Sequence, residues 1–180
     1  MKPVGHDRRH LRVAKLATRH RSALSVFLRQ LDSKTTHDYT HFGYEIEKPA
    51  DTADNILEEI AHGRTVGYVL LDGNTILGLG HLDFFPKKEK RHVVRLGIVI
   101  HQRCQGRGLG RRLLDSMIED ATRMGIKKIW VATYADNRRA LELYRSRGFL
   151  VEGVFRKEEK VQGRYRDVIS MALFLDEVRE

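Results

Sequence analysis

Residues 98–114 read IVIHQRCQGRGLGRRLL and hold the pattern that decides the fold. An apolar run ending at Ile100 predicts a β-strand, and the apolar spacing over 109–124 predicts an amphipathic helix. The turn between them carries glycines at alternate positions, namely Gly106, Gly108 and Gly110. Glycines leave room for close approach, so successive backbone amides and the helix N-terminus can bind the oxygens of a phosphate.

Arginines around this turn support an anion site. The glycine spacing excludes two common classes of phosphate-binding loop. Arg107, Arg111 and Arg112 can add charge-assisted hydrogen bonds to a phosphate. The segment has no Gly-Lys-Ser/Thr of a nucleoside-triphosphate loop, and its glycines lack the last spacing of the dinucleotide fingerprint. The turn therefore predicts a phosphate site of another class.

Apolar periodicity and turn residues predict the rest of the fold. Strands are predicted at 12–16, 66–71, 75–84, 92–100, 128–134, 150–160 and 164–174, and helices at about 23–31, 52–62, 109–124 and 137–147. The segment 32–44 breaks the helical pattern and predicts a loop. This loop either determines specificity or is a plain surface loop. The order β-α-α-β-β-β-α-β-α-β-β predicts an α/β fold, a single domain with a mixed central β-sheet flanked by helices on both faces.

Composition excludes several classes of protein. The 180 residues carry 33 Lys and Arg against 24 Asp and Glu, a net charge of +9. Such charge can attract nucleic acid, but much of it surrounds the glycine turn or opens the helix at 137–147, so we predict no nucleic-acid partner. Cys104 is the only cysteine, which excludes an intramolecular disulfide, and no Cys/His spacing predicts a metal site.

The charged residues 1–10 predict a basic flexible lead-in to a domain at 11–176. Neither a signal peptide nor a membrane-spanning run is evident, so we expect a cytoplasmic protein without membrane contact.

Two motifs together resemble the Gcn5-related N-acetyltransferase (GNAT) superfamily. Gln105-x-x-Gly108-x-Gly110 after a strand resembles its acetyl-CoA signature. Residues 137–149, NRRALELYRSRGF, resemble its later helix, in which an asparagine, an alanine, a tyrosine and a Gly-Phe pair recur at these spacings. The resemblance covers roughly residues 92–150.

The resemblance implies a cleft between splayed parallel strands that binds acetyl-CoA as co-substrate, without a metal. It implies that the backbone of Ile98, Val99 and Ile100 binds the pantetheine arm like an added strand. The implied pyrophosphate site comprises Gln105, Gly106, Arg107, Gly108, Leu109, Gly110 and Arg111. Asn137 would contact the arm near the thioester, and it can equally be the N-cap of its helix.

The resemblance also assigns Tyr144 as the general acid that protonates the leaving thiolate, with packing as the alternative role. A backbone amide near Val99 would stabilise the oxyanion. Val94 and Leu96 stand where some relatives carry a base, and neither can accept a proton.

Candidates for the base therefore lie elsewhere. His81 and Asp83 alternate on the preceding strand and could face the cleft, while His92 begins the next strand. Each could equally be structural, and a water chain or an amine that binds neutral would also suffice. His101 is interpreted as a connector residue.

The acceptor is expected to be a primary amine of a small molecule: a polyamine, an amino sugar or an amino-acid-like compound. Tyr39 and His41, in the segment 32–44, are candidates for binding it. The alternatives are a protein N-terminus or lysine as acceptor, and a non-catalytic regulator that binds acyl-CoA. A homodimer is possible.

Overall fold

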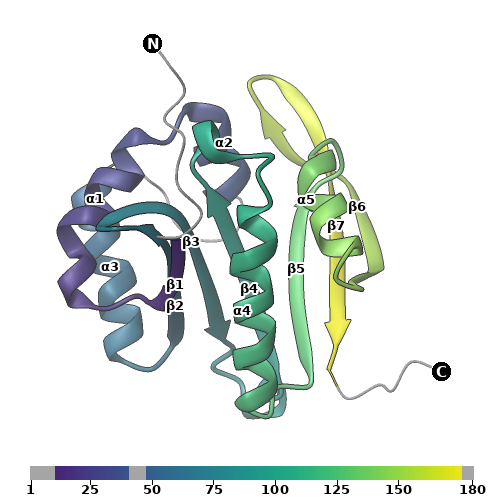
Figure 1. The fold of residues 1–180 in the computed structure, drawn as a ribbon. Helices are drawn as coiled ribbons and strands as arrows, with labels where there is room; N and C mark the ends of the chain where they lie inside the picture. Colours follow the sequence, from purple (N-terminus) through teal and green to yellow (C-terminus); the bar gives the residue numbers. More distant parts are fainter. Residues whose placement is uncertain (1–10, 41–47, 176–180) are drawn as a thin grey trace.

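The computed structural model describes residues 11–40 and 48–175, which form one layered α/β unit (Figure 1). The predicted lead-in at 1–10 and the candidate His41 lie outside the described residues. The strands are β1 (Leu11–Lys15), β2 (Thr65–Asp72), β3 (Thr75–Phe84), β4 (Val93–Ile100), β5 (Lys128–Tyr134), β6 (Leu150–Val161) and β7 (Arg164–Phe174). The helices are α1 (Arg21–Gln30), α2 (Ser33–Thr40), α3 (Pro49–Ala61), α4 (Leu109–Arg123) and α5 (Arg138–Arg145).

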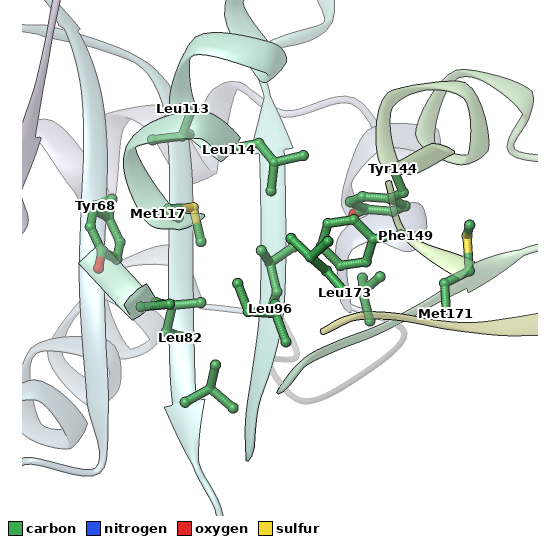
Figure 2. Close-up of a cluster of buried hydrophobic side chains, with 14 of the residues drawn as sticks. Tyr68, Leu82, Leu96, Leu113, Leu114, Met117, Tyr144, Phe149, Met171 and Leu173 are labelled. Atoms are coloured by element: carbon green, nitrogen blue, oxygen red, sulfur yellow. The ribbon is translucent and has the colours of Figure 1, made fainter. Parts of the chain in front are cut away.

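The strands form one seven-stranded mixed sheet in the order β1-β2-β3-β4-β5-β7-β6. Leu24 and Phe27 of α1 and Ile56 of α3 bury one face of the sheet in a cluster with Val69 and Leu79. On the other face, α4 and α5 cover a second and larger cluster (Figures 1 and 2). The prediction of a mixed sheet with helices on both faces is confirmed.

The sheet is splayed between β4 and β5, its two parallel neighbours. Only Val93–Arg95 pair with Lys128–Trp130, although β4 continues to Ile100 and β5 to Tyr134. The other neighbouring strands that the structure describes pair antiparallel. The predicted divergence of parallel strands is therefore confirmed, and it leaves one edge of β4 open over its second half.

The segment 32–44 is not a loop throughout, since Ser33–Thr40 form helix α2. Asp32 precedes the helix, and its Oδ1 accepts a hydrogen bond from the Thr35 amide (2.7 Å), which satisfies one of the amides of the first turn. Lys34 and Asp38, one turn apart, form an ion pair of 2.7 Å. For residues 33–40 the prediction of a loop was wrong, because local capping and ion pairing replace the apolar stripe that marks most helices.

An ion-pair cluster holds α4 against the first two strands. Asp120 on α4 pairs with Lys15 of β1 and with Arg123, and Lys15 also donates to the Tyr68 hydroxyl (3.0 Å). Burial alone would raise the pKa of Asp120, but hydrogen bonds from Lys15, Arg123 and Tyr68 outweigh it and lower the pKa to about 2. The carboxylate therefore stabilises the folded state more than the unfolded chain.

Asp120→Asn is expected to lower the free energy of unfolding by about 1–2 kcal/mol near neutral pH. Because the folded pKa lies below the unfolded one, this contribution is complete above the unfolded value and is lost as pH falls towards the folded one. Urea unfolding at about pH 7 and about pH 3 should show the difference from wild type shrinking in acid. The exposed Asp51→Asn on α3 is the control, and an undiminished difference at low pH would contradict the prediction.

Candidate active site

The diverged ends of β4 and β5 open a cleft of about 1000 Å³, which also takes walls from α2, β3, the glycine turn and α5. Among the residues predicted from sequence, those that line it are His81, Ile98, Val99, Ile100, Gln105, Gly106, Gly108, Leu109, Gly110, Arg111, Asn137 and Tyr144. Asp83, Arg107 and His92 are not among the lining residues. The fold thus gathers residues from separate elements around one space.

The main-chain groups of β4 point to alternate sides. The His101 amide donates to the Leu77 carbonyl on the β3 side (2.9 Å). Since an antiparallel ladder repeats its direction every second residue, Val99 also directs its amide and carbonyl to β3. The side chain of Val99 is buried in the cluster with Leu79, and its main-chain groups face β3, so they are not available to a ligand on the open edge.

Ile98 and Ile100, by the same alternation, direct their main-chain groups to the open edge. The Ile100 carbonyl accepts a hydrogen bond from the Gln105 side-chain amide (3.1 Å), as this direction requires. An extended ligand could pair with this edge as a strand would.

The glycine turn combines left-handed backbone with free space. Gly106 has φ 75° and Gly108 has φ 78°, and a Cβ at either would meet no heavy atom within 4 Å. Gly108 is the N-cap of α4 and supplies no side-chain cap, so the first amides of the helix remain for a ligand. The turn is a cradle that fits a phosphate group.

Gly110 has a packing role in addition to the phosphate contact that the sequence predicts. It lies inside α4, and a Cβ there would stand 3.3 Å from a methyl group of Leu143 and 3.6 Å from Ile100. This glycine therefore lets α4 pack closely against α5 and β4, in addition to lining the cleft.

The arginines of the turn have two different roles: Arg111 lines the cleft, and Arg112 holds the turn to β1. Arg111 lines the cleft, together with Arg138 and Arg139 from the start of α5. Arg112 instead donates to the Leu11 carbonyl of β1 (2.5 Å), so its expected contact with a phosphate is replaced by a structural one.

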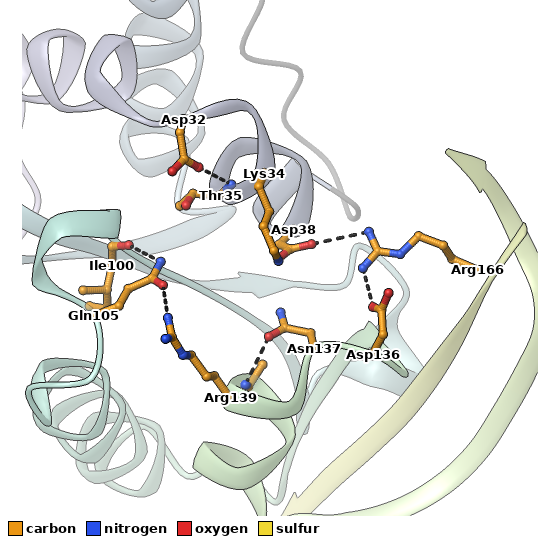
Figure 3. A network of polar contacts seen from close by, with 11 residues as sticks. Asp32, Lys34, Thr35, Asp38, Ile100, Gln105, Asp136, Asn137, Arg139 and Arg166 are labelled. Atoms are coloured by element: carbon orange, nitrogen blue, oxygen red, sulfur yellow. Dashed lines mark hydrogen bonds and ion pairs between the residues drawn. The ribbon is translucent and has the colours of Figure 1, made fainter. Parts of the chain in front are cut away.

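Gln105 acts as a clasp across the cleft (Figure 3). Its amide nitrogen donates to Ile100, and its amide oxygen accepts from Arg139 Nη1 (2.9 Å). The side chain thus joins the end of β4 to α5.

Asn137 is the N-cap of α5, as the alternative interpretation predicted. Its Oδ1 accepts from the Ala140 amide (3.3 Å), which leaves the Nδ2 donors for the cleft that Asn137 lines (Figure 3). The capping role is compatible with a ligand contact.

Tyr144 lies on α5, the helix that Asn137 caps, and it also lines the cleft. It is 4% exposed and packs on Phe149 with ring centroids 5.4 Å apart (Figure 2). Burial raises the pKa of its phenol above the ordinary value, so the hydroxyl stays protonated at neutral pH. Tyr144 can therefore donate a proton or a hydrogen bond into the cleft.

The two histidines at the ends of β4 take no part in the cleft. His92 is exposed, and its carbonyl accepts from Lys127 and Lys128 where β4 begins, at the opposite end from the glycine turn. His101 Nδ1 accepts from the Arg103 amide (3.2 Å) and caps a short 3-10 helix. His101 is the connector that the sequence predicted.

Helix α2 forms the wall opposite the glycine turn (Figure 3). Asp38 accepts from Arg166 of β7 (3.4 Å), and Arg166 also pairs with Asp136, which follows β5. The Arg166 guanidinium lies 3.4 Å from the centre of the Tyr134 ring. One arginine thus holds α2 to the far side of the cleft; the side chain of the candidate Tyr39 lies outside the described residues.

Arg166→Ala is expected to speed amide hydrogen exchange in α2 roughly 5- to 30-fold, because about 1–2 kcal/mol of charge-assisted bonding to Asp38 is lost. Arg147→Ala is the control, since Arg147 pairs with Asp115 away from the cleft. Unchanged exchange across 33–40 would contradict the role given to Arg166.

Neither a group of His, Cys, Asp and Glu fit to hold a metal nor a helix long and apolar enough to cross a membrane occurs within 11–40 and 48–175.

The sequence matches a known protein family over most of its length. The model of the acetyltransferase (GNAT) family matches residues 28–149, which include β2 to α5 and the whole glycine turn. The chain belongs to the GNAT family. The solved GNAT structures most similar in fold include an acetyltransferase of Streptococcus pneumoniae, with TM-score 0.77 and 22% identity over 91% of this chain and 99% of that one.

A second solved relative is yncA of Salmonella typhimurium, determined with its cofactor acetyl-CoA. It has TM-score 0.76 and 22% identity over 93% of this chain and 95% of that one. At this identity the likeness shows that the two share the GNAT fold.

Curated GNAT relatives match a shorter stretch. The L-amino acid N-acyltransferase MnaT of Escherichia coli is 34% identical over 50% of this chain and 52% of its own length. The L-methionine sulfoximine/L-methionine sulfone acetyltransferase of Pseudomonas paraeruginosa is 30% identical over 74% of this chain and 80% of its own length. The spermidine N(1)-acetyltransferase of Escherichia coli is 33% identical over 43% of this chain and 42% of its own length. The chain thus spans about half the length of several of the curated relatives that it matches.

Proposed function

We propose that the protein transfers the acetyl group of acetyl-CoA directly to a primary amine of a small molecule. The observation that carries this proposal is the cleft of a GNAT-family chain in which the open edge of β4 leads to the glycine cradle at the start of α4. A strand edge and an anion cradle in line fit a ligand with an amide-containing arm and a diphosphate.

The main chain of Ile98 and Ile100 would hold the pantetheine arm, with Asn137 Nδ2 reaching it from the other side. Amides from Gly106 to Gly110 would hold the diphosphate. Arg111 and the arginines at the start of α5 would neutralise its charge.

Acetyl-CoA supplies a thioester whose acyl carbon an amine can attack. The Ile98 amide, on the open edge, would donate a hydrogen bond where charge develops on the acyl oxygen. Tyr144 remains protonated and would donate its phenolic proton to the sulfur as the C–S bond breaks.

A small-molecule acceptor is favoured by the relatives, whose names assign them L-amino acids, methionine derivatives or spermidine. The wall formed by α2 presents charges of both signs, Asp32, Lys34 and Asp38, which suits an amine that carries further polar groups. We therefore place an amino-acid-like compound, a polyamine or an amino sugar against α2.

Calorimetry with coenzyme A and acetyl-CoA tests the cofactor site, and thiol release with pools of amino acids, polyamines, amino sugars and peptides tests the transfer. We expect micromolar or tighter affinity and turnover with one of the first three pools. Absence of affinity for either coenzyme would refute the proposal, and affinity without turnover would indicate a regulator that binds acyl-CoA.

A further inference from the structure

Asp83 is a buried carboxylate fixed from three sides. The Thr65 hydroxyl donates to Oδ1 (2.7 Å), and Arg95 donates to Oδ2 through Nη2 (2.7 Å) and Nε (3.0 Å). Burial alone would raise the pKa of Asp83, but the hydrogen bonds and charges of His81, Thr65 and Arg95 hold it below the usual range. Asp83 therefore stays ionised and is a poor proton acceptor, contrary to its prediction as a base.

His81 stands between this carboxylate and the cleft. Its Nδ1 lies 3.1 Å from Asp83 Oδ1, and the residue is 6% exposed. A carboxylate at this distance favours the tautomer with the proton on Nδ1, which leaves Nε2 as an acceptor. His81 lines the cleft, whereas Asp83 is not among its lining residues.

Gly97 on β4 allows the imidazole to reach this position. The register places Gly97 opposite His81, and a Cβ on Gly97 would lie 2.0 Å from Nε2 and 2.5 Å from Cε1. The ring thus lies across the backbone of β4, with Nε2 as its nearest atom. Ile98, whose main chain forms the open edge, is the next residue.

We propose that His81 is the general base of the reaction and that Asp83 is its positioning residue. This inference rests on the proposed acetyl transfer. The amine nitrogen forms the new C–N bond with its lone pair, and its proton passes to His81 Nε2. As the C–S bond breaks, the sulfur takes the electron pair and the Tyr144 proton, and solvent returns the proton from His81 to Tyr144.

Three other carboxylates that line the cleft are already engaged. Asp38 and Asp136 pair with Arg166, and Asp32 caps α2. The places on β4 that could hold a base carry Val94 and Leu96, which are buried in the core. Among the described groups that line the cleft, His81 has both a nitrogen acceptor and a carboxylate behind it.

His81→Gln tests the catalytic role, because glutamine keeps polarity at this site but cannot take the proton. With L-methionine sulfone and spermidine as probe acceptors, we expect kcat to fall about 100-fold and the Kd of acetyl-CoA to stay within about twofold. His20→Gln is the control, since His20 is also buried and accepts from the Ala17 amide far from the cleft. Turnover of His81→Gln equal to that of wild type would overturn the proposal.

Gly97→Ala tests the position of the His81 imidazole without changing the imidazole itself. The added methyl group must displace the imidazole, so kcat should fall although His81 is intact. Asp83→Asn should lower kcat in the same way. Normal turnover in Gly97→Ala would overturn the placement of Nε2 at the reacting atoms.

Nitrogen-15 NMR of the imidazole gives a readout that requires no acceptor and no variant. In the free wild-type protein we expect the proton of neutral His81 on Nδ1, and a proton on Nε2 would overturn the proposal. Wild-type protein that binds no acetyl-CoA, whatever the tautomer, would refute the proposed transfer itself. The two failures are therefore distinguishable.

Discussion

Tyr144→Phe is expected to lower kcat about 1000-fold while leaving the Kd of acetyl-CoA unchanged. The ring would still pack on Phe149, because only the hydroxyl is removed. The protein would lose the one phenol that lines the described cleft and that burial keeps protonated. Steady-state rates of thiol release, with calorimetry of acetyl-CoA, measure both quantities.

Tyr68→Phe is the matched control for this prediction. Tyr68 is also buried with a raised pKa, but its hydroxyl faces Lys15 and Asp120, away from the cleft. We expect this control to be less stable yet fully active. If Tyr144→Phe turned over as fast as the control, the phenol would be a packing residue and the proton would come from water.

Gly108→Val is expected to weaken binding of coenzyme A about 1000-fold, the equivalent of two lost charge-assisted hydrogen bonds. A β-branched residue is strongly disfavoured at φ 78°, so the turn must move and carry the first amides of α4 out of line. Isothermal calorimetry with coenzyme A and with acetyl-CoA measures the loss.

Gly163→Val matches this change in backbone strain without touching the cleft. Gly163 has φ 81° in the turn between β6 and β7, and a Cβ there would also meet no heavy atom within 4 Å. We expect its stability to fall and its affinity to remain. Equal loss of affinity in both variants would mean that strain, rather than the position of the amides, explains the result.

The sequence was sufficient for the parts of the fold that local patterns encode. Apolar periodicity and glycine stops predicted every strand and the helices α1, α3, α4 and α5 to within a few residues. Helix α2 was missed, although Asp32 three residues before Thr35 was a usable capping signal. The ion pair from Asp38 to Arg166 joins residues 128 apart in sequence, and no local pattern reports it.

The parts of the site that lie within the two sequence motifs were predictable. The glycine turn, Asn137 and Tyr144 come together in the cleft as the two motifs indicated. Facts that depend on the register between strands were not predictable. The direction of the Val99 backbone and the placement of His81 over Gly97 both follow from how β3 pairs with β4.

The clasp formed by Gln105 and the packing of Gly110 also required the three-dimensional structure. Gln105 belongs to the recognised motif, but its partners Ile100 and Arg139 become visible only once α5 is placed beside β4. The motif therefore identified the residues of the site, and the three-dimensional structure was needed to show what each of them contacts.

The splay between β4 and β5 bears on the risk of aggregation through an open strand edge. An unsatisfied strand edge at the rim of a sheet invites other chains to add to it, and aggregation can follow. Here the unsatisfied edge lies in the middle of the strand order, walled by helices α4 and α5 and by the turn that precedes α4 (Figure 1). A slender ligand can enter such a recess, whereas a neighbouring polypeptide with full side chains meets those walls first.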